Sequence, residues 1–208
     1  MYHYPVMKKE CIGGLNINPE GVYADGTFGG HSRAILDRLT TGHLYAFDQD
    51  EDAAANAFDD ERFTFIPQNF KYFKNFIQLY HGGKIDGVIA DLGVSSHQFD
   101  TPEKGFSTRF DGPLDMRMSQ MTPNDAAIVV NTYDHAALTR ILRLYGEMQQ
   151  PQLIASDIIM ARETEPIETT EQLKAAVQRR LPRGKENKVL AQLFQALRIE
   201  VNQELDAL

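Results

Sequence analysis

The chain has 208 residues, and 29 Asp and Glu against 21 Lys and Arg give it a formal charge of −8. This charge excludes a protein that coats nucleic acid with a uniformly basic surface, so any polyanion must meet a local patch. The hydrophobic share of 42% predicts an ordinary globular core, and the single cysteine, Cys11, excludes a disulfide framework and a cysteine-rich zinc site. Without a signal-like start or an 18-residue apolar run, we expect a soluble, cytoplasmic protein.

The first hundred residues alternate between short apolar runs and segments with helical periodicity. We expect strands at 22–24, 43–47, 63–66 and 87–92, with helices at 31–39, 50–58 and 73–80 between them. Such repeats predict an α/β fold, in which helices cover both faces of a parallel sheet.

The character of the sequence changes after about residue 98. Residues 100–125 have no clear periodicity, which predicts a long ordered loop that is either functional or mobile. Only helices are expected beyond it, and Thr169 and Gln172 form the pattern of a capping box. The helices are expected at 136–145, 153–162, 169–181 and 188–208, the last running to the end of the chain.

A glycine-rich turn joins the first strand to the first helix of the sheet region. It reads Asp25-Gly-Thr-Phe-Gly-Gly-His-Ser32 and does not contain the G-x-G-x-x-G pattern of a dinucleotide site. An acid at the strand end suits a ligand with a cationic amine or sulfonium, such as S-adenosylmethionine. The alternative is a tight turn without a ligand.

Polar and aromatic residues follow the later strands. Asp48 ends the second strand 23 residues after the acid of the glycine turn, near the offset of ~20 typical of an acid that binds ribose hydroxyls. Phe70 offers a face for adenine or packs in the core. Asp91 ends the fourth strand, and Ser95 and Ser96 bind a ligand or cap the loop.

Sequence blocks in order along the chain resemble the RsmH (MraW) family, S-adenosylmethionine-dependent methyltransferases that modify N4 of a cytosine in the decoding region of small-subunit (16S) ribosomal RNA. The most specific block is Arg109-Phe-Asp-Gly-Pro-Leu-Asp-Met-Arg-Met118. The others include the glycine turn, Phe47-Asp48-Gln-Asp50, Asp91-Leu-Gly-Val-Ser-Ser96 and Phe194-Gln-Ala-Leu-Arg-Ile-Glu-Val-Asn202.

The resemblance implies a Rossmann-like class I methyltransferase sheet with an all-helical inserted domain. It implies a cofactor-binding part at 1–100, a helical insertion with a lid loop at 101–188, and a helix at 189–208 that returns to the methyltransferase domain. The implied partner is small-subunit ribosomal RNA or the 30S particle. The implied cofactor is S-adenosylmethionine, bound by Asp25, Gly29, Gly30, His31, Asp48, Phe70, Asp91 and Gln98.

Two departures from the family pattern affect these expectations. The glycine turn is two residues shorter than the family usually has, and the family pattern continues into further strands after the last helix. We therefore expect a sheet without its C-terminal strands and a shortened chain whose turnover is reduced or absent.

Asp91 is the predicted catalytic residue. Methyl transfer from a sulfonium depends on holding the acceptor nitrogen in line, and acceptors for the amine N–H groups favour the developing charge. We expect these acceptors at Asp91 and at the carbonyls of residues 92–95. The alternative is that Asp91 serves only the cofactor.

Four arginines are candidates for RNA binding. Arg109 and Arg117 lie in the segment 105–118, which is either a lid over the target base or a methionine-rich packing segment. Arg179 and Arg180 begin a run with five positive charges, which is either a phosphate patch or a solvated helix end.

The histidines have no metal-ligand spacing, so we expect no metal. Two other functions stay open: a non-catalytic RNA- or ribosome-binding module that keeps a cofactor pocket, and a nicotinamide-dependent oxidoreductase. The pattern does not predict an oligomeric state.

Overall fold

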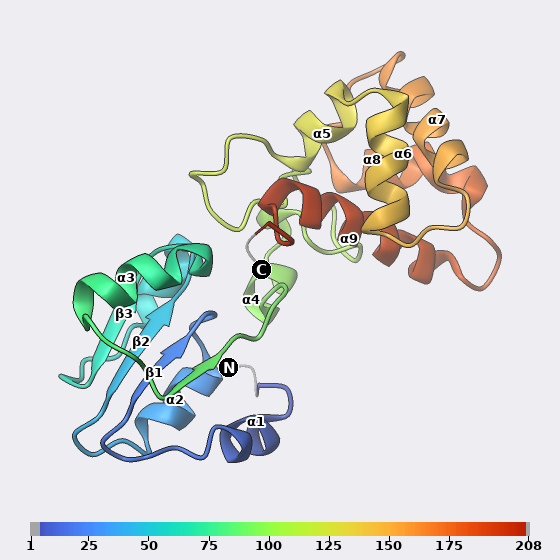
Figure 1. Ribbon diagram of the computed structural model, residues 1–208. Helices are drawn as coiled ribbons and strands as arrows, with labels where there is room; N and C mark the ends of the chain where they lie inside the picture. Colours follow the sequence, from blue (N-terminus) through green and yellow to red (C-terminus); the bar gives the residue numbers. More distant parts are fainter. Residues whose placement is uncertain (1–4, 207–208) are drawn as a thin grey trace. The chain divides into compact units, whose positions relative to one another are not determined.

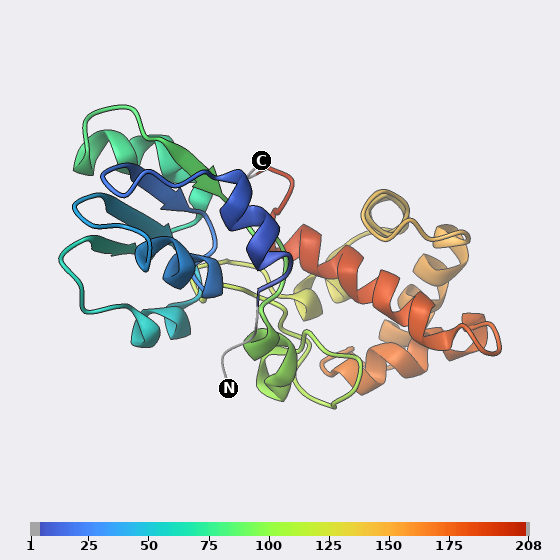
Figure 2. The ribbon, with the colours of Figure 1, turned by 90° about the horizontal axis from the view of Figure 1, so that it is seen from below.

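The structure is a computed structural model that describes residues 5–206, and within that range it forms two compact units, 5–93 and 94–206 (Figures 1 and 2). The sequence placed functional boundaries at residues 100 and 188 instead. Each unit has its own core, and the two are described separately.

The first unit is built on a four-stranded parallel sheet in the order β3-β2-β1-β4. The strands are β1 (Val22–Asp25), β2 (His43–Phe47), β3 (Phe63–Ile66) and β4 (Gly87–Ile89). This confirms the predicted α/β fold. The fourth strand ends three residues earlier than predicted, because Asp25, the last residue of β1, pairs with Ile89.

Alternate side chains of the strands build two separate cores. Helices α1 (Lys8–Gly14) and α2 (Gly30–Leu36) cover one face, and α3 (Phe73–Tyr80) covers the other (Figure 1). Successive strand residues point to opposite faces, so a hydrophobic run fills both cores. The α1–α2 face buries Tyr23, Leu44, Ala46 and Phe63, and the α3 face buries Ala24, Tyr45, Phe47 and Ile66.

Two of the predicted helices in this unit differ from the structure. The segment expected as a helix at 50–58 is a 3₁₀ stretch, η1 (Glu51–Asn56), none of whose residues is buried. Without an apolar stripe to pack, the acidic and alanine-rich segment has no reason to extend as an α-helix. Helix α2 ends at Leu36, three residues before the predicted end.

The second unit contains helices only, as predicted, apart from one isolated β-bridge. Its capping box is confirmed, since the Gln172 amide donates to Thr169 Oγ1 (3.2 Å) and the Thr169 amide donates to Gln172 Oε1 (3.0 Å). The elements are α4 (Ser96–Asp100), η3 (Pro102–Lys104), α5 (Ala126–Thr132), α6 (His135–Leu144), α7 (Pro151–Arg162), α8 (Thr170–Val177), η4 (Gln178–Arg180) and α9 (Glu186–Asn202).

The segment after η3 is a packed part of this unit. Its apolar residues Phe106, Leu114, Met116 and Met118 are buried in the helical core. Asn202 holds it to α9, because its side chain accepts from the Met118 amide (2.7 Å) and donates to the Met116 carbonyl (2.8 Å). These contacts favour the packing interpretation of the segment over a lid.

Helix α9 ends at Asn202 and does not run to the end of the chain as expected. Gln203 adopts a left-handed conformation (φ 50°), and Arg198 pairs with Glu204 across this turn (2.7 Å). The apolar stripe of α9 is buried with α5 and α6 in the core of the second unit. Residues 207 and 208 of the predicted helix lie outside the described range. Within that range, no helix has the length and apolar character needed to cross a membrane.

Candidate functional site

The strand order reverses next to β1, which is where open parallel sheets bind their ligands. Strands β2 and β3 lie on one side of β1, and β4 lies on the other. Ligands of such sheets bind outside the carboxyl ends of the strands at the reversal. The acids predicted from the sequence lie at this edge: Asp25 ends β1, Asp48 follows β2 and Asp91 follows β4.

The glycine turn bridges three strands at this edge. The Gly26 amide donates to the Ile89 carbonyl of β4, and the Phe28 amide donates to the Phe47 carbonyl of β2, both at 2.8 Å. A Cβ added at Gly29 would meet no atom closer than 3.9 Å, so the backbone there borders open space. A ligand can therefore approach the main chain closely at this residue.

The Asp25 carboxylate is fully buried and is used by the turn itself. Oδ1 accepts hydrogen bonds from the Thr27 amide (3.0 Å) and hydroxyl (3.3 Å), and Oδ2 accepts from the Ser32 hydroxyl (2.6 Å). Burial raises the pKa of Asp25 to about 7, although the bonds from Ser32 and Thr27 oppose the rise. Asp25 thus anchors the loop, and its predicted contact with the cofactor stays a prediction.

Thr27 connects this anchor to Asp91. Its hydroxyl oxygen accepts a hydrogen bond from the Asp91 amide at 2.7 Å. The Asp91 side chain is 48% exposed, and its Oδ2 lies 3.8 Å from Nδ1 of the buried His31. The other ring nitrogen of His31 lies 3.2 Å from the Val6 carbonyl oxygen. The backbone of Asp91 is therefore fixed while its carboxylate reaches solvent.

The roles of Thr27 and Ser32 were not predicted from the sequence. The signal was present, because an Asp followed two residues later by Thr often forms a side-chain turn. Its connection to Asp91, 64 residues away, depends on the pairing of β1 with β4 and has no local signal.

The loops after β2 and β3 are linked beside Asp48 and Phe70. Asp48 Oδ1 accepts from the Asp50 amide (2.9 Å), and the Asn69 side-chain amide donates to Gln49 Oε1 (2.8 Å). Phe70 is partly buried against the core under α3. Asp48 stays at the sheet edge where ribose binding was predicted, and Phe70 is shared between the core and the surface.

Gln98 belongs to the second unit and closes the capping box of α4. Its side-chain oxygen accepts from the Ser95 amide (3.0 Å), and the Ser95 hydroxyl accepts from the Gln98 amide (3.1 Å). Ser95 is therefore a helix cap, one of the two roles considered for it. The cofactor contact of Gln98 stays a prediction.

The arginines of the segment 105–118 both pair with carboxylates of their own unit. Arg109 bonds to Asp100 (2.5 Å), and its guanidinium lies about 5 Å from the ring of Phe99. Arg117 forms two hydrogen bonds to Asp115 (2.8 and 2.7 Å). Their predicted contacts with RNA would have to compete with these ion pairs.

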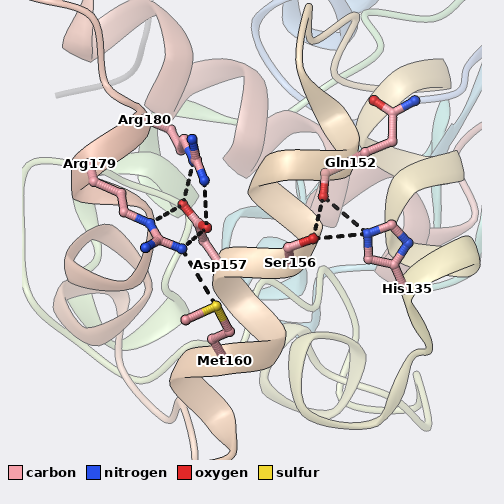
Figure 3. Close-up of polar contacts among 7 residues, drawn as sticks. All are labelled: His135, Gln152, Ser156, Asp157, Met160, Arg179 and Arg180. Carbon is pink, nitrogen blue, oxygen red and sulfur yellow. Dashed lines mark hydrogen bonds and ion pairs between the residues drawn. The ribbon is translucent and has the colours of Figure 1, made fainter.

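Arg179 and Arg180 converge on one buried acid, Asp157 of α7 (Figure 3). The Asp157 side chain is only 1% exposed, and it accepts from Nε of Arg179 (2.9 Å) and of Arg180 (2.8 Å). These bonds, that from Arg179 foremost, lower the pKa of Asp157 to about 2. The pair fastens η4 to α7, and its predicted role as a phosphate patch stays a prediction.

The part of the chain that the structure describes contains no group of three or more His, Cys, Asp and Glu side chains arranged to hold a metal.

The parallel sheet, its glycine turn and the acids at its edge together define a Rossmann-like methyltransferase fold. The model of the MraW methylase family matches residues 1–208, so the chain belongs to this family, as the resemblance predicts.

Three relatives share the name ribosomal RNA small subunit methyltransferase H. The proteins of Flavobacterium johnsoniae and Cytophaga hutchinsonii are 54% and 52% identical to the chain over its whole length, which covers 70% and 71% of theirs. That of Flavobacterium psychrophilum is 56% identical over 97% of the chain and 70% of its own length.

Proposed function

We propose that this protein transfers a methyl group from S-adenosylmethionine to N4 of a cytosine in the decoding region of small-subunit ribosomal RNA. Family membership and the names of the relatives support methylation of this RNA. The observation that carries the proposal is the solvent-facing Asp91, whose backbone is held at the strand-order reversal by Thr27 (2.7 Å). Such a substrate would place the protein in the cytoplasm.

The residues at the sheet edge fit this cofactor. S-adenosylmethionine carries a positive sulfonium, an amino group and two ribose hydroxyls, which match an edge built from carboxylates. Asp48 would accept hydrogen bonds from the ribose, and Gly29, Gly30 and His31 would line the methionine side. The open space beside Gly29 admits a ligand against the backbone. When bound, the cofactor supplies an electrophilic methyl group on a positively charged sulfur.

Asp91 is the residue we assign to the acceptor. The exocyclic amine of cytosine is a weak nucleophile, because its lone pair is conjugated with the ring. A carboxylate that accepts a hydrogen bond from this amine favours the form in which the lone pair is free to react. Asp91 combines a fixed backbone with an exposed carboxylate, as this role requires. The other role, binding the cofactor alone, is distinguished by experiment.

The target base has to leave its stack before it can reach this edge. Extruding a base costs a few kcal/mol in a duplex and least in a single strand. We assign phosphate contacts to Arg109, Arg117, Arg179 and Arg180. Each of these arginines already pairs with a carboxylate, so it would have to leave that carboxylate or bind it and an RNA phosphate together.

The test is methyl incorporation into 30S particles that lack the modification, followed by mass spectrometry of the nucleosides. We expect N4-methylcytidine at one site. Asp91→Asn should lower turnover and leave cofactor affinity within about twofold if Asp91 acts on the amine; a matching loss of affinity assigns it to the cofactor.

Incorporation at another base or atom would contradict the assignment of the acceptor. Tight binding of the cofactor and of RNA without any transfer would instead favour the non-catalytic alternative.

A further inference from the structure

Helix α3 and the turn before it carry lysines and no acidic residue, although the protein as a whole is acidic. Residues 62–85 contain four cationic residues and no Asp or Glu, whereas the whole chain carries a charge of −8. Arg62 is paired with Asp60. The other three, Lys71, Lys74 and Lys84, form no ion pair with any carboxylate among residues 5–206. This surface therefore attracts anions without first breaking an internal ion pair.

An aromatic stripe runs along the outward side of α3. Tyr72, Asn75, Phe76 and Leu79 recur at helical spacing and, with Gln68, line a shallow hollow of about 320 Å³, which we call the α3 hollow. Tyr72 is 43% exposed and Leu79 72% exposed, while Ile77 on the opposite side of the helix packs against the sheet. Phe76 also packs against this core, so the stripe runs from the edge of the core to the exposed side of the helix.

Lys71 and the amides beside the stripe are placed for a polar, anionic chain. Lys71 Nζ lies 5.1 Å from the centre of the Tyr72 ring, which sets a positive charge next to an exposed aromatic face. Asn69 fixes this geometry, because its side-chain oxygen accepts from the Lys71 amide (2.9 Å). Gln68 and Asn75 add donors and acceptors at the rim of the α3 hollow.

We propose that the α3 hollow binds a single-stranded segment of the RNA substrate, with a base stacked on Tyr72 and a neighbouring phosphate on Lys71. The inference rests on the proposed function for the identity of the polyanion. Proteins that bind single strands combine aromatic platforms with basic grooves. Lys71 and the amides of Gln68 and Asn75 at the hollow fit RNA better than an apolar protein partner, since lysine is depleted in the cores of protein interfaces.

The experiment measures the affinity of the full chain for a fluorescent single-stranded RNA of the decoding region, over a range of salt concentrations. Tyr72→Ala should weaken binding about 5- to 100-fold, the effect of one lost stacked base, and Tyr72→Phe, which keeps the ring, should bind like wild type. Changing Lys71 to Gln should flatten the salt dependence of log K by about 0.7, the share of one single-strand phosphate.

The matched control changes Lys9 of α1 to Gln, which alters the net charge by the same amount and should leave the salt slope unchanged. Affinity for S-adenosylmethionine and the thermal midpoint, measured on every variant, exclude a folding defect as the cause of lost binding.

Equal RNA binding by the α3 variants and the control would overturn the inference. A dimer of the wild type that Leu79→Lys dissolves would also overturn it, since the stripe would then belong to a second copy of the chain. A failure of the proposed function is distinguished from a failure of this inference, because in the first case the wild type itself would transfer no methyl group to 30S particles.

Discussion

The Thr27 hydroxyl offers the sharpest test of how the candidate site is held together. It accepts a hydrogen bond from the Asp91 amide (2.7 Å) and donates one to the buried Asp25 carboxylate (3.3 Å). Thr27→Val keeps the shape of the side chain and removes both bonds. Thr27→Ser keeps the hydroxyl and is the matched control.

The expected cost follows from the partners that lose a bond. The Asp25 carboxylate keeps its bonds from the Thr27 amide and from Ser32, whereas the Asp91 amide loses the bond to this hydroxyl. A single such loss costs about 0.5–1.5 kcal/mol, and more when a buried group is left unpaired, so we expect about 1–2 kcal/mol in unfolding free energy. If the displaced Asp91 no longer meets the acceptor, a similar loss in the transition state slows methyl transfer about 5- to 30-fold.

Three assays on the two variants separate stability, cofactor binding and turnover: urea denaturation, calorimetry with S-adenosylmethionine, and single-turnover methylation of 30S particles. We expect Thr27→Ser to follow the wild type, and Thr27→Val to lose turnover beyond its loss of cofactor affinity. If Thr27→Val and Thr27→Ser gave the same values in all three assays, the hydrogen bond from the Asp91 amide to Thr27 would contribute nothing to stability, cofactor binding or turnover.

Three further changes test other parts of the structure. Gly29→Ala places its Cβ in the open space beside the turn, where the cofactor is expected. Calorimetry should therefore show weaker cofactor binding, while the unfolding free energy changes by less than about 0.5 kcal/mol. Gly42→Ala is the contrast, because its Cβ would lie 2.2 Å from the Gly21 carbonyl oxygen and should destabilise the fold. Asp25 holds a proton up to about pH 7 in the folded state but only to about pH 4 when unfolded, so its contribution to stability falls as pH rises from about 4 to 7. Asp25→Asn should remove this dependence, and a wild-type-to-variant difference in urea stability that stays constant over that range would refute it. Asp157→Ala should lower the unfolding free energy by about 1–3 kcal/mol at pH 7, and urea denaturation should show this loss shrink as pH falls from about 4 towards 2. Arg179→Gln should lower it less, because Arg180 still binds the Asp157 carboxylate.

The sequence predicts the elements whose patterns are local. The strands at 43–47 and 63–66 and helix α3 have the predicted bounds, because continuous apolar runs and helical periodicity are both visible in a short window. The capping box at Thr169 is equally local. The short helices α1 and α5, with seven residues each, were not predicted.

Contacts between distant residues could not be read from the sequence. Asp157 looks like an ordinary acid on a helix, and only the fold brings Arg179 and Arg180 onto it (Figure 3). The methionine-rich segment likewise lacks periodicity because it is held by Asn202, 84 residues beyond Met118.

The edge of the sheet was predictable in part. A parallel sheet necessarily gathers its strand ends, so the positions of Asp25, Asp48 and Asp91 followed from the strand assignments. That Asp25 faces its own loop depends on where Thr27 and Ser32 direct their hydroxyls.

Calorimetry of the chain with S-adenosylmethionine and, separately, with NAD tests the central claim most directly, which is that the carboxylates of Asp48 and Asp91, which follow β2 and β4, receive a cationic methyl donor. We predict saturable binding of S-adenosylmethionine that Asp48→Asn weakens at least tenfold, and no binding of NAD. Binding of NAD in its place, or an S-adenosylmethionine affinity that Asp48→Asn and Asp91→Asn both leave unchanged in the folded protein, would contradict the account.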